Sequence, residues 1–505
     1  MRIIRSFIAA AVFLPASLSA QAVAQQAGPA PLPAHGTAAI TAADVHERIA
    51  FLASDALAGR NTPSPGLETA ASYVAAELAR FGLKPGGDQG TFIQRYPFAQ
   101  SGLDREAVAF RVGDTSLAYS QDFFVVPGSP DSLGGKALYV GTARAEMSFP
   151  AAVRGRIIVV AVPDTLGAET MQRWQANLVA ALRAGMAAEA AGIVAVLDPA
   201  FNPASIQMLS GMTAQQSAPL PLYGVSHTSL APALTAAGID LAQLRATEPA
   251  SPVELPLDLM LRTASGRIPV AVPNVVGVLP GSDPVLRDEY VVFSAHIDHV
   301  GIGRPDAQGD SIFNGADDDA SGTTAVLEVA QAFAAQPKAP ARSLIFLLVS
   351  GEEKGLRGSA HFAAHPTVPI AKLVADINID MIGRNHPDTV SAIGQEYTDL
   401  GATLQQVAGT HAAELKLVAA PDLWPEENLF VRSDHYSFAA RGVPAIFFTT
   451  GLHADYHKQS DEPETIDNDK LSRIARMVYL LGEAVANSHA RPQWTEAGKA
   501  KLKLQ

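Results

Sequence analysis

Short apolar runs alternate with helical segments over the second half of this 505-residue chain. Five runs rich in Val, Ile, Leu, Phe and Ala are predicted to be buried strands: 275–279, 290–295, 343–349, 375–379 and 445–449. A helical pattern occupies 321–335, where Ser321 is expected to cap the helix. A strand that is apolar on both sides must be covered on both sides. The alternation therefore predicts a mostly parallel sheet with helices on both faces.

Imidazole and carboxylate side chains follow three of these strands directly. They are His296 and Asp298 after the second run, Glu352 and Glu353 after the third, and Asp380 after the fourth. In open α/β sheets, ligands bind outside the carboxyl ends of the strands. We therefore expect these side chains to meet at one edge of the sheet.

Two further clusters carry the same residue types. One is the run Asn-Gly-Ala-Asp-Asp-Asp-Ala-Ser-Gly at 314–322, and the other is His-Ala-Asp-Tyr-His at 453–457. Imidazoles together with several carboxylates suit zinc, and one carboxylate can bridge two ions. The motifs His-Glu-x-x-His and Gly-x-Ser-x-Gly are missing, so other common hydrolase centres are not predicted.

Charge and cysteine content exclude several classes of function. The formal net charge of −13 argues against nucleic acids and anionic membranes as partners. The chain has no cysteine, which excludes disulfides, cysteine-ligated zinc and a cysteine nucleophile. Hydrophobic residues make up 48% of the chain, enough to bury a large core.

The first 24 residues have the features of a bacterial export signal. Arg2 and Arg5 precede an apolar segment at 7–18, and small-x-small cleavage sites end at Ala20 and Ala24. The apolar segment is shorter than the roughly 20 residues that a membrane span needs. We therefore predict a cleaved signal peptide and a periplasmic or secreted protein without a membrane partner after cleavage. An N-terminal anchor is the alternative.

The first half of the chain differs from the second half in composition and in predicted secondary structure. Residues 25–38 are rich in Ala, Pro and Gly and are predicted to form a leader. Amphipathic helices are expected from Thr41 and over 66–81. Residues 105–255 contain short β-rich runs and an Ala-rich helix but none of the clusters above, which indicates an inserted α/β module.

The motif order resembles metallopeptidase family twenty-eight. The motifs are His-x-Asp, Gly-Ala-Asp-Asp-x-Ala-Ser-Gly, Gly-Glu-Glu, Asp-Met-Ile-Gly, Ser-Asp-His and Tyr-His. The resemblance implies a three-layer α/β/α zinc-peptidase domain with a mostly parallel mixed sheet, formed by 39–104 and 256–490 and followed by a tail at 491–505. The insertion resembles a protease-associated domain.

The resemblance also implies roles for single residues. Two zinc ions per chain would be held by His296 and Asp380, by Glu353 and His457, and by Asp318 as the bridge. Asp298 would orient the imidazole of His296. The family pattern gives no ligand role to His299, His435 or His453.

Glu352 would be the general base for attack by a metal-bridging hydroxide. Tyr456 would help to stabilise the oxyanion. Arg432 would contact substrate or form an ion pair with Asp434. Asp317 and Asp319 are interpreted as turn and helix-start residues.

The implied activity is that of an exported dizinc aminopeptidase acting on peptides. A carboxypeptidase for acidic residues is the alternative, with cationic groups from Arg304, Arg357, Arg384 and Arg432. Glutaminyl cyclisation is disfavoured because the full dizinc ligand set is present. A catalytically inactive receptor is the remaining alternative.

Overall fold

The computed structural model describes residues 36–503, except 145, 163–167, 200, 214–217, 247–248 and 264. The predicted signal peptide and most of the predicted leader lie outside the described residues. The chain forms two compact units, one from residues up to Phe98 together with those from Ala271 onward, and one from Ala99–Val270. The second unit extends beyond the predicted insertion at both ends, because two long strands cross the boundary.

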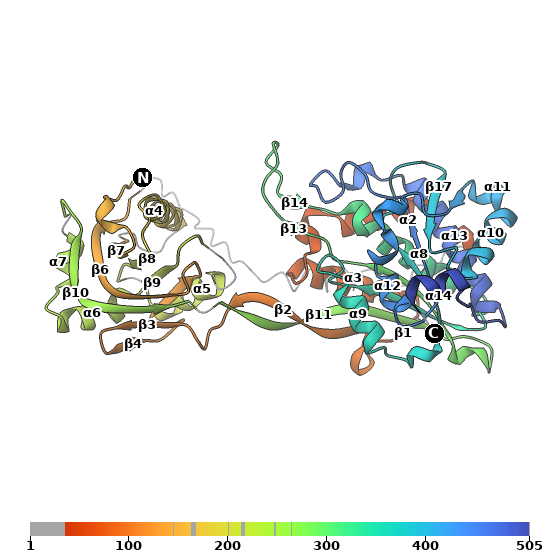
Figure 1. Ribbon diagram of the computed structural model, residues 1–505, viewed down its shortest axis with the longest axis horizontal. Coiled ribbons are helices and arrows are strands. Elements are labelled where there is room, and N and C mark those ends of the chain that lie inside the picture. The colour runs from red at the N-terminus through yellow and green to blue at the C-terminus, as the bar shows by residue number, and fades with distance from the viewer. Residues whose placement is uncertain are drawn as a thin grey trace, which may run out of the picture. The chain divides into compact units, whose positions relative to one another are not determined.

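The first unit is built on a mixed sheet (Figure 1). Its strands are β1 (Lys84–Pro85), β2 (Ile93–Leu103), β11 (Ser265–Leu279), β12 (Tyr290–His296), β15 (Ser343–Val349), β16 (Leu373–Ile379), β17 (Thr389–Ile393), β18 (Val418–Ala420) and β19 (Ala445–Thr449). Their order is β1-β11-β15-β12-β16-β19-β17-β18, with β2 paired to β11. The four central strands β15, β12, β16 and β19 run parallel, as predicted.

Helices cover both faces of this sheet. They are α2 (Ala42–Leu52), α3 (Pro65–Arg80), α8 (Gly322–Ala334), α9 (Arg357–Ala364), α10 (Leu400–Thr410), α11 (Ala412–Leu415), α12 (His435–Ala439), α13 (Asn468–Asn487) and α14 (Glu496–Leu502). Figure 1 shows α2, α8 and α13 side by side, and these three helices contact one another.

Alternate residues of each central strand enter different cores. Val291 and Phe293 of β12 pack in the core shared with α8 and α13. Val292 packs in a smaller core on the other face with Phe362 of α9 and Phe438 of α12. Successive strand residues point to opposite faces, so a strand buried on both sides produces a three-layer α/β/α unit. The predicted fold class is confirmed.

The two helix starts differ in how well the sequence predicted them. Thr41 caps α2 as expected, because its side chain accepts a hydrogen bond from Asp44 N. Ser321 precedes α8, but its side chain does not cap the helix. The Asp319 carboxylate accepts from Gly322 N at 2.8 Å instead, so the predicted Ser321 cap is wrong. The hydroxyl of Ser321 donates to Asp317 O.

The second unit has a sheet of its own. Its strands are β3 (Ala109–Val112), β4 (Thr115–Leu117), β5 (Phe123–Val126), β6 (Ser132–Thr142), β7 (Ile157–Ala161), β8 (Gly192–Val196), β9 (Leu222–Val225) and β10 (Val253–Arg262). Its helices are α4 (Ala168–Ala187), α5 (Pro203–Thr213), α6 (His227–Ala236) and α7 (Leu241–Ala246). Apolar cores lie on both faces of the sheet. This unit is thus α/β, as the sequence predicted for the insertion.

No helix within the described parts of the chain is both long and apolar enough to cross a membrane. A short two-stranded ribbon, β13 (Gly301–Ile302) and β14 (Ile312–Phe313), connects the end of β12 to the aspartate-rich turn before α8. That turn, η6 (Ala316–Ser321), carries the predicted bridging ligand Asp318.

Candidate metal centre

The predicted metal-donor residues follow neighbouring strands and lie at one edge of the sheet. His296 is the last residue of β12, Glu352 and Glu353 follow β15, and Asp380 follows β16. The order β15-β12-β16 makes these strands adjacent and parallel. The carboxyl ends of adjacent parallel strands lie together, which is why residues 84 positions apart in sequence become neighbours.

A first donor group consists of His296, Asp318 and Asp380. Nε2 of His296 lies 3.2 Å from Oδ1 of Asp318 and 3.5 Å from Oδ1 of Asp380. All three residues are buried.

A second donor group uses the other oxygen of Asp318. Nε2 of His457 lies 3.1 Å from Oδ2 of Asp318 and 3.1 Å from Oε1 of Glu353. Nδ1 of His299 lies 2.9 Å from the same Glu353 oxygen and 3.6 Å from Asp318 Oδ2. Each oxygen of Asp318 therefore faces a different donor group, which is the arrangement of a bridging carboxylate.

The donor spacing fits metal ions. Four atoms that each lie about 2.1 Å from a tetrahedral zinc ion are roughly 3.4 Å from one another, close to the distances in both groups. Several of the donor atoms are buried without a hydrogen-bond partner among the described residues: Nδ1 of His299, Oε1 of Glu353 and Oδ1 of Asp380. Buried polar atoms are rarely left without a partner, so these atoms are arranged for cations.

The five predicted ligands lie close together in the structure, and a sixth residue lies with them. His296 groups with Asp380, Glu353 groups with His457, and Asp318 lies between the two pairs. His299, which was expected to have no ligand role, lies in the second group. Its Nδ1 faces the carboxylates of Glu353 and Asp318. Its place in His-Ile-Asp-His was the only signal in the sequence.

Ionisation of the carboxylates depends on the imidazoles that face them. Burial opposes ionisation of Asp318, but His299 and His296 outweigh it and hold its pKa well below the usual value. Burial and the nearby Asp318 raise the pKa of Glu353, yet the flanking imidazoles lower it to about 2. Burial lowers the pKa of His457, but its carboxylate contacts raise it to about 10. Protons on the imidazoles thus compete with metal ions for the same donors.

Glu352 lies beside both donor groups without belonging to either. It lines a pocket together with His296, Asp318 and Asp380. None of the hydrogen bonds or ion pairs seen among the described residues engages its carboxylate, whereas its backbone N donates to Oδ1 of Asp298 at 3.3 Å. Burial raises the pKa of Glu352 well above its ordinary value.

Asp298 orients His296 through its main chain. Nδ1 of His296 lies 3.0 Å from the carbonyl oxygen of Asp298 and 3.7 Å from its carboxylate. The carboxylate accepts from the Thr62 hydroxyl at 2.8 Å and from Glu352 N. Asp298 therefore supports the Glu352 loop with its side chain and the imidazole with its backbone, whereas the sequence analysis assigned the orienting role to the side chain.

Tyr456 and Arg432 both line the pocket beside the donors. The ring of Tyr456 stacks on that of His457, with ring centroids 3.9 Å apart. Arg432 is 40% exposed and its Nη1 lies 3.1 Å from Oε2 of Glu427. The carboxylate partner of Arg432 is thus Glu427 and not Asp434.

Three supporting residues were missed by the sequence analysis. Ser433 donates its hydroxyl to Oδ2 of Asp380 at 2.8 Å and accepts from the side chain of Asn378. Arg60 is fully buried and donates to the carbonyls of Ile297, Asn314 and Gly315, so it joins the two loops that carry the donors. The Ser-Asp-His motif was visible in the sequence, but the contacts of Ser433 and of Arg60 depend on the fold.

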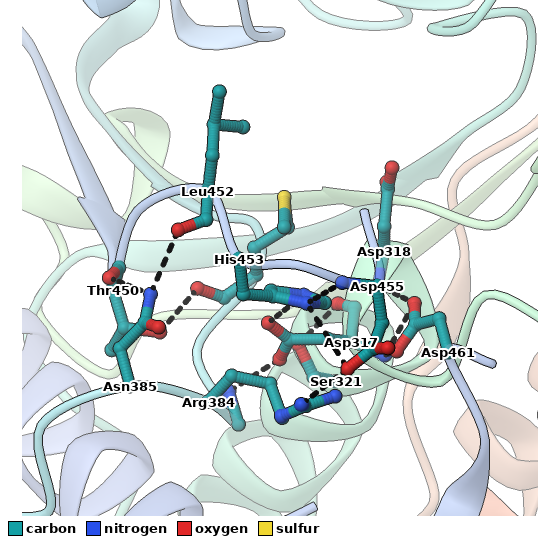
Figure 2. Close-up of polar contacts among 12 residues, drawn as sticks. Asp317, Asp318, Ser321, Arg384, Asn385, Thr450, Leu452, His453, Asp455 and Asp461 are labelled. Carbon is teal, nitrogen blue, oxygen red and sulfur yellow. Dashed lines mark hydrogen bonds and ion pairs between the residues drawn. The ribbon is translucent and has the colours of Figure 1, made fainter. Parts of the chain in front are cut away.

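A second polar network surrounds the turn that carries Asp318 (Figure 2). Asp461 accepts hydrogen bonds from the backbone N–H groups of Asp317 and Asp318 at 3.0–3.2 Å. Nε2 of His453 lies 3.2 Å from Oδ2 of Asp317, outside both donor groups. In Figure 2 the loop that carries His453 is further tied down by the ion pair between Arg384 and Asp455 at 2.6 Å. The network therefore holds the Asp318 turn and the loop of His457 against each other.

Residues 274–481 match the sequence profile of peptidase family M28. This part of the chain, which contains every residue of both donor groups, is similar to peptidase family M28.

Similar proteins carry names that agree with this family. A probable zinc metalloprotease from Pyrenophora tritici-repentis is 37% identical over 264 residues, which covers 44% of this chain and 59% of that protein. The aminopeptidase YwaD of Bacillus subtilis is 22% identical over 230 residues, with 44% and 46% covered. The chain spans about half the length of the curated relatives that it matches.

A solved structure of a zinc aminopeptidase from Bacillus subtilis has a TM-score of 0.48 to this chain. The two chains are 16% identical in sequence, and the aligned part covers 92% of this chain and 98% of the Bacillus subtilis chain.

Proposed function

We propose that this protein is a zinc-dependent exopeptidase that uses two zinc ions, most specifically an aminopeptidase that removes N-terminal residues from peptides. The observation that carries this proposal is the pair of donor groups that share Asp318, with the carboxylate of Glu352 in the same pocket. A catalytic zinc site keeps one position open for water or substrate, and a carboxylate beside that position can act as a general base.

Zinc ions held by these donors would supply Lewis acidity for the scissile carbonyl and for the attacking water. Glu352 takes the proton of the attacking water on its carboxylate and then passes it to the nitrogen of the leaving amine. Tyr456 donates its phenolic hydrogen to the carbonyl oxygen as negative charge develops there. Asp298 keeps the Glu352 loop in place through the backbone hydrogen bond described above.

The pocket wall favours an aminopeptidase over a carboxypeptidase for acidic residues. Recognition of a side-chain carboxylate needs cationic groups that are free to bind it. Arg384 is engaged by Asp455 and Thr465, and Arg432 is paired with Glu427. The remaining wall carries apolar side chains from Leu429, Phe447 and Leu452. This lining suits an aminopeptidase substrate better than an acidic C-terminal residue. Such a substrate would place an apolar side chain against the wall and its ammonium group near the carboxylates.

The test is hydrolysis of matched substrates by purified protein of known zinc content. We expect cleavage of free aminoacyl amides and peptides but not of their N-acetylated forms, lost on chelation and restored by zinc. Release of C-terminal residues without regard to acetylation would establish the carboxypeptidase instead. Two bound zinc ions with no hydrolysis of any peptide would refute the enzyme proposal and favour the receptor.

We also propose that the chain is exported, on the basis of Arg2, Arg5 and the apolar segment that follows them. Expression in a bacterial host followed by N-terminal sequencing tests this proposal. A mature protein that begins after Ala20 or Ala24 in the periplasm or medium supports it, whereas an intact N-terminus on a membrane-bound protein contradicts it.

A further inference from the structure

His299 is a buried imidazole that faces two carboxylates. Its side chain has no exposed surface, and its Nδ1 points at Oε1 of Glu353 and Oδ2 of Asp318. The 2.9 Å contact with Glu353 does not have hydrogen-bond geometry, and both atoms are left without a partner among the described residues. Two buried polar atoms that lie this close and lack hydrogen-bond partners are placed to bind one cation together.

Other buried histidines of the chain show that this environment is unusual. His435 is buried to the same extent, but it packs between the rings of Phe430 and Phe447. Burial lowers its pKa to about 3, so it stays neutral and acts as an apolar side chain. His453 accepts a backbone hydrogen bond from Asp455 N. Among the buried histidines of the described residues that were not predicted as ligands, only His299 shares its carboxylate contacts with a predicted zinc ligand, His457.

The surrounding backbone is built around the His299 ring. Gly315 has a φ of +59°, and a Cβ atom there would lie 2.5 Å from Cγ of His299. Any side chain at Gly315 would therefore displace the imidazole. The backbone of Asn61 forms a parallel bridge with that of His299, next to the buried Arg60 that ties the donor loops together. The ring is thus held in one place by segments that are far apart in sequence.

We propose that His299 is a fourth protein ligand of the second zinc ion, so that the two ions sit in unequal sites; this inference rests on the proposed function. The second site has four protein donors, from His299, Asp318, Glu353 and His457, whereas the first has three, from His296, Asp318 and Asp380. Four protein donors complete a tetrahedral zinc site, while three leave a position for water or substrate.

This inequality assigns different tasks to the two ions. The second ion is held in a closed site and fixes Asp318 and Glu353 in place. The first ion is the one with an open position, and it lies in the pocket that Glu352 and Tyr456 line. The first ion should therefore exchange more readily than the second.

Stepwise removal of zinc from the intact protein with a chromophoric chelator tests the assignment. We expect wild-type protein to release one zinc ion at low chelator concentration and the other only at much higher concentration. His299→Gln should weaken the tight site by more than about 100-fold, because loss of an outer-shell partner alone costs roughly 10–100-fold. The matched control His435→Gln removes a buried histidine outside the site and should keep the wild-type release curve.

Cobalt substitution supplies a second readout that does not depend on activity. The visible absorption of Co²⁺ reports its coordination, so one intense tetrahedral spectrum should be present in the wild type and in His435→Gln. It should be lost or weakened in His299→Gln and His299→Ala. If one His299 variant fails to fold, the other variant and the stepwise zinc release from the wild type still test whether His299 is a ligand.

Two outcomes overturn the inference. One is the retention of both zinc ions with wild-type affinities and an unchanged cobalt spectrum in the folded His299 variants. The other is simultaneous release of both ions from the wild type. In either case zinc-dependent hydrolysis by the wild type would leave the proposed function standing, whereas its absence with zinc bound would refute the function separately.

Discussion

The hydroxyl of Ser433 donates a hydrogen bond to Oδ2 of Asp380 at 2.8 Å, and the other oxygen of that carboxylate faces Nε2 of His296 at 3.5 Å. Asn378 in turn donates to the Ser433 oxygen. The chain of contacts fixes which oxygen of Asp380 is free for a cation. Partners of this kind orient ligands and tune their affinity.

Ser433→Ala should therefore weaken zinc binding at the first site by about 10–100-fold and lower turnover at limiting zinc. Excess zinc should restore most of the activity, because the ligands themselves remain. Ser437→Ala is a matched control: it also removes a buried hydroxyl, one that contacts Ser359. Zinc titration followed by initial rates measures both effects. Equal zinc affinities in the two variants would show that Ser433 does not orient Asp380.

Substitution of the two adjacent glutamates should separate their roles. Glu352→Gln should keep both zinc ions and lose turnover by about 10²–10⁴-fold, because only the proton acceptor is removed. Glu353→Gln should lose zinc from the second site, because it removes a donor oxygen that lies 3.1 Å from His457 Nε2. Zinc content and hydrolysis rates measured on the same preparations distinguish the loss of a proton acceptor from the loss of a zinc ligand. Near-normal turnover in Glu352→Gln would exclude it as the base.

Zinc should stabilise the folded protein. Without cations, the buried carboxylates of Asp318, Glu353 and Asp380 lie close together and rely on imidazole protons for compensation. Zinc at about 100 times its dissociation constant should add roughly 2.7 kcal/mol per independent site to the free energy of unfolding. Thermal unfolding with and without a chelator measures this as a higher Tm with zinc. An unchanged Tm would contradict zinc binding to the folded chain.

Acid should destabilise the protein partly through His435. Burial lowers its pKa to about 3, whereas the imidazole of the unfolded chain titrates near 6.5. Between pH 6.5 and 3 the unfolded state therefore binds a proton that the folded state does not bind. The free energy of unfolding should fall with decreasing pH by about 1.4 kcal/mol per unit from this group, with no effect above pH 6.5.

His435→Gln should flatten that acid dependence by the same amount, even if it is less stable at neutral pH. Urea unfolding at pH 7 and pH 5 gives the difference for wild type and variant. His365→Gln, at an exposed position, serves as the control and should keep the wild-type slope. Equal slopes in wild type and His435→Gln would show that His435 is not held neutral.

Local pattern in the sequence was sufficient for the fold class and for most of the donors. Apolar runs without alternation require burial on both sides, which made the central strands β12, β15 and β16 predictable. Ligands lie at the carboxyl ends of such strands, so the sequence alone places His296, Glu353 and Asp380 in one group. The bridging role proposed for Asp318 rests on the resemblance in motif order.

Side-chain direction was decided only by the tertiary structure. Whether His299 turns toward Glu353 depends on Gly315 and on the segment around Arg60, which lies more than 200 residues earlier in the chain. Asp319 rather than Ser321 caps α8 because the same carboxylate also accepts from His296 N at the end of β12. The sequence determines which residue types reach the sheet edge through short-range periodicity. The atom that each of them presents there is set by packing and hydrogen bonds between distant segments, which no local pattern encodes.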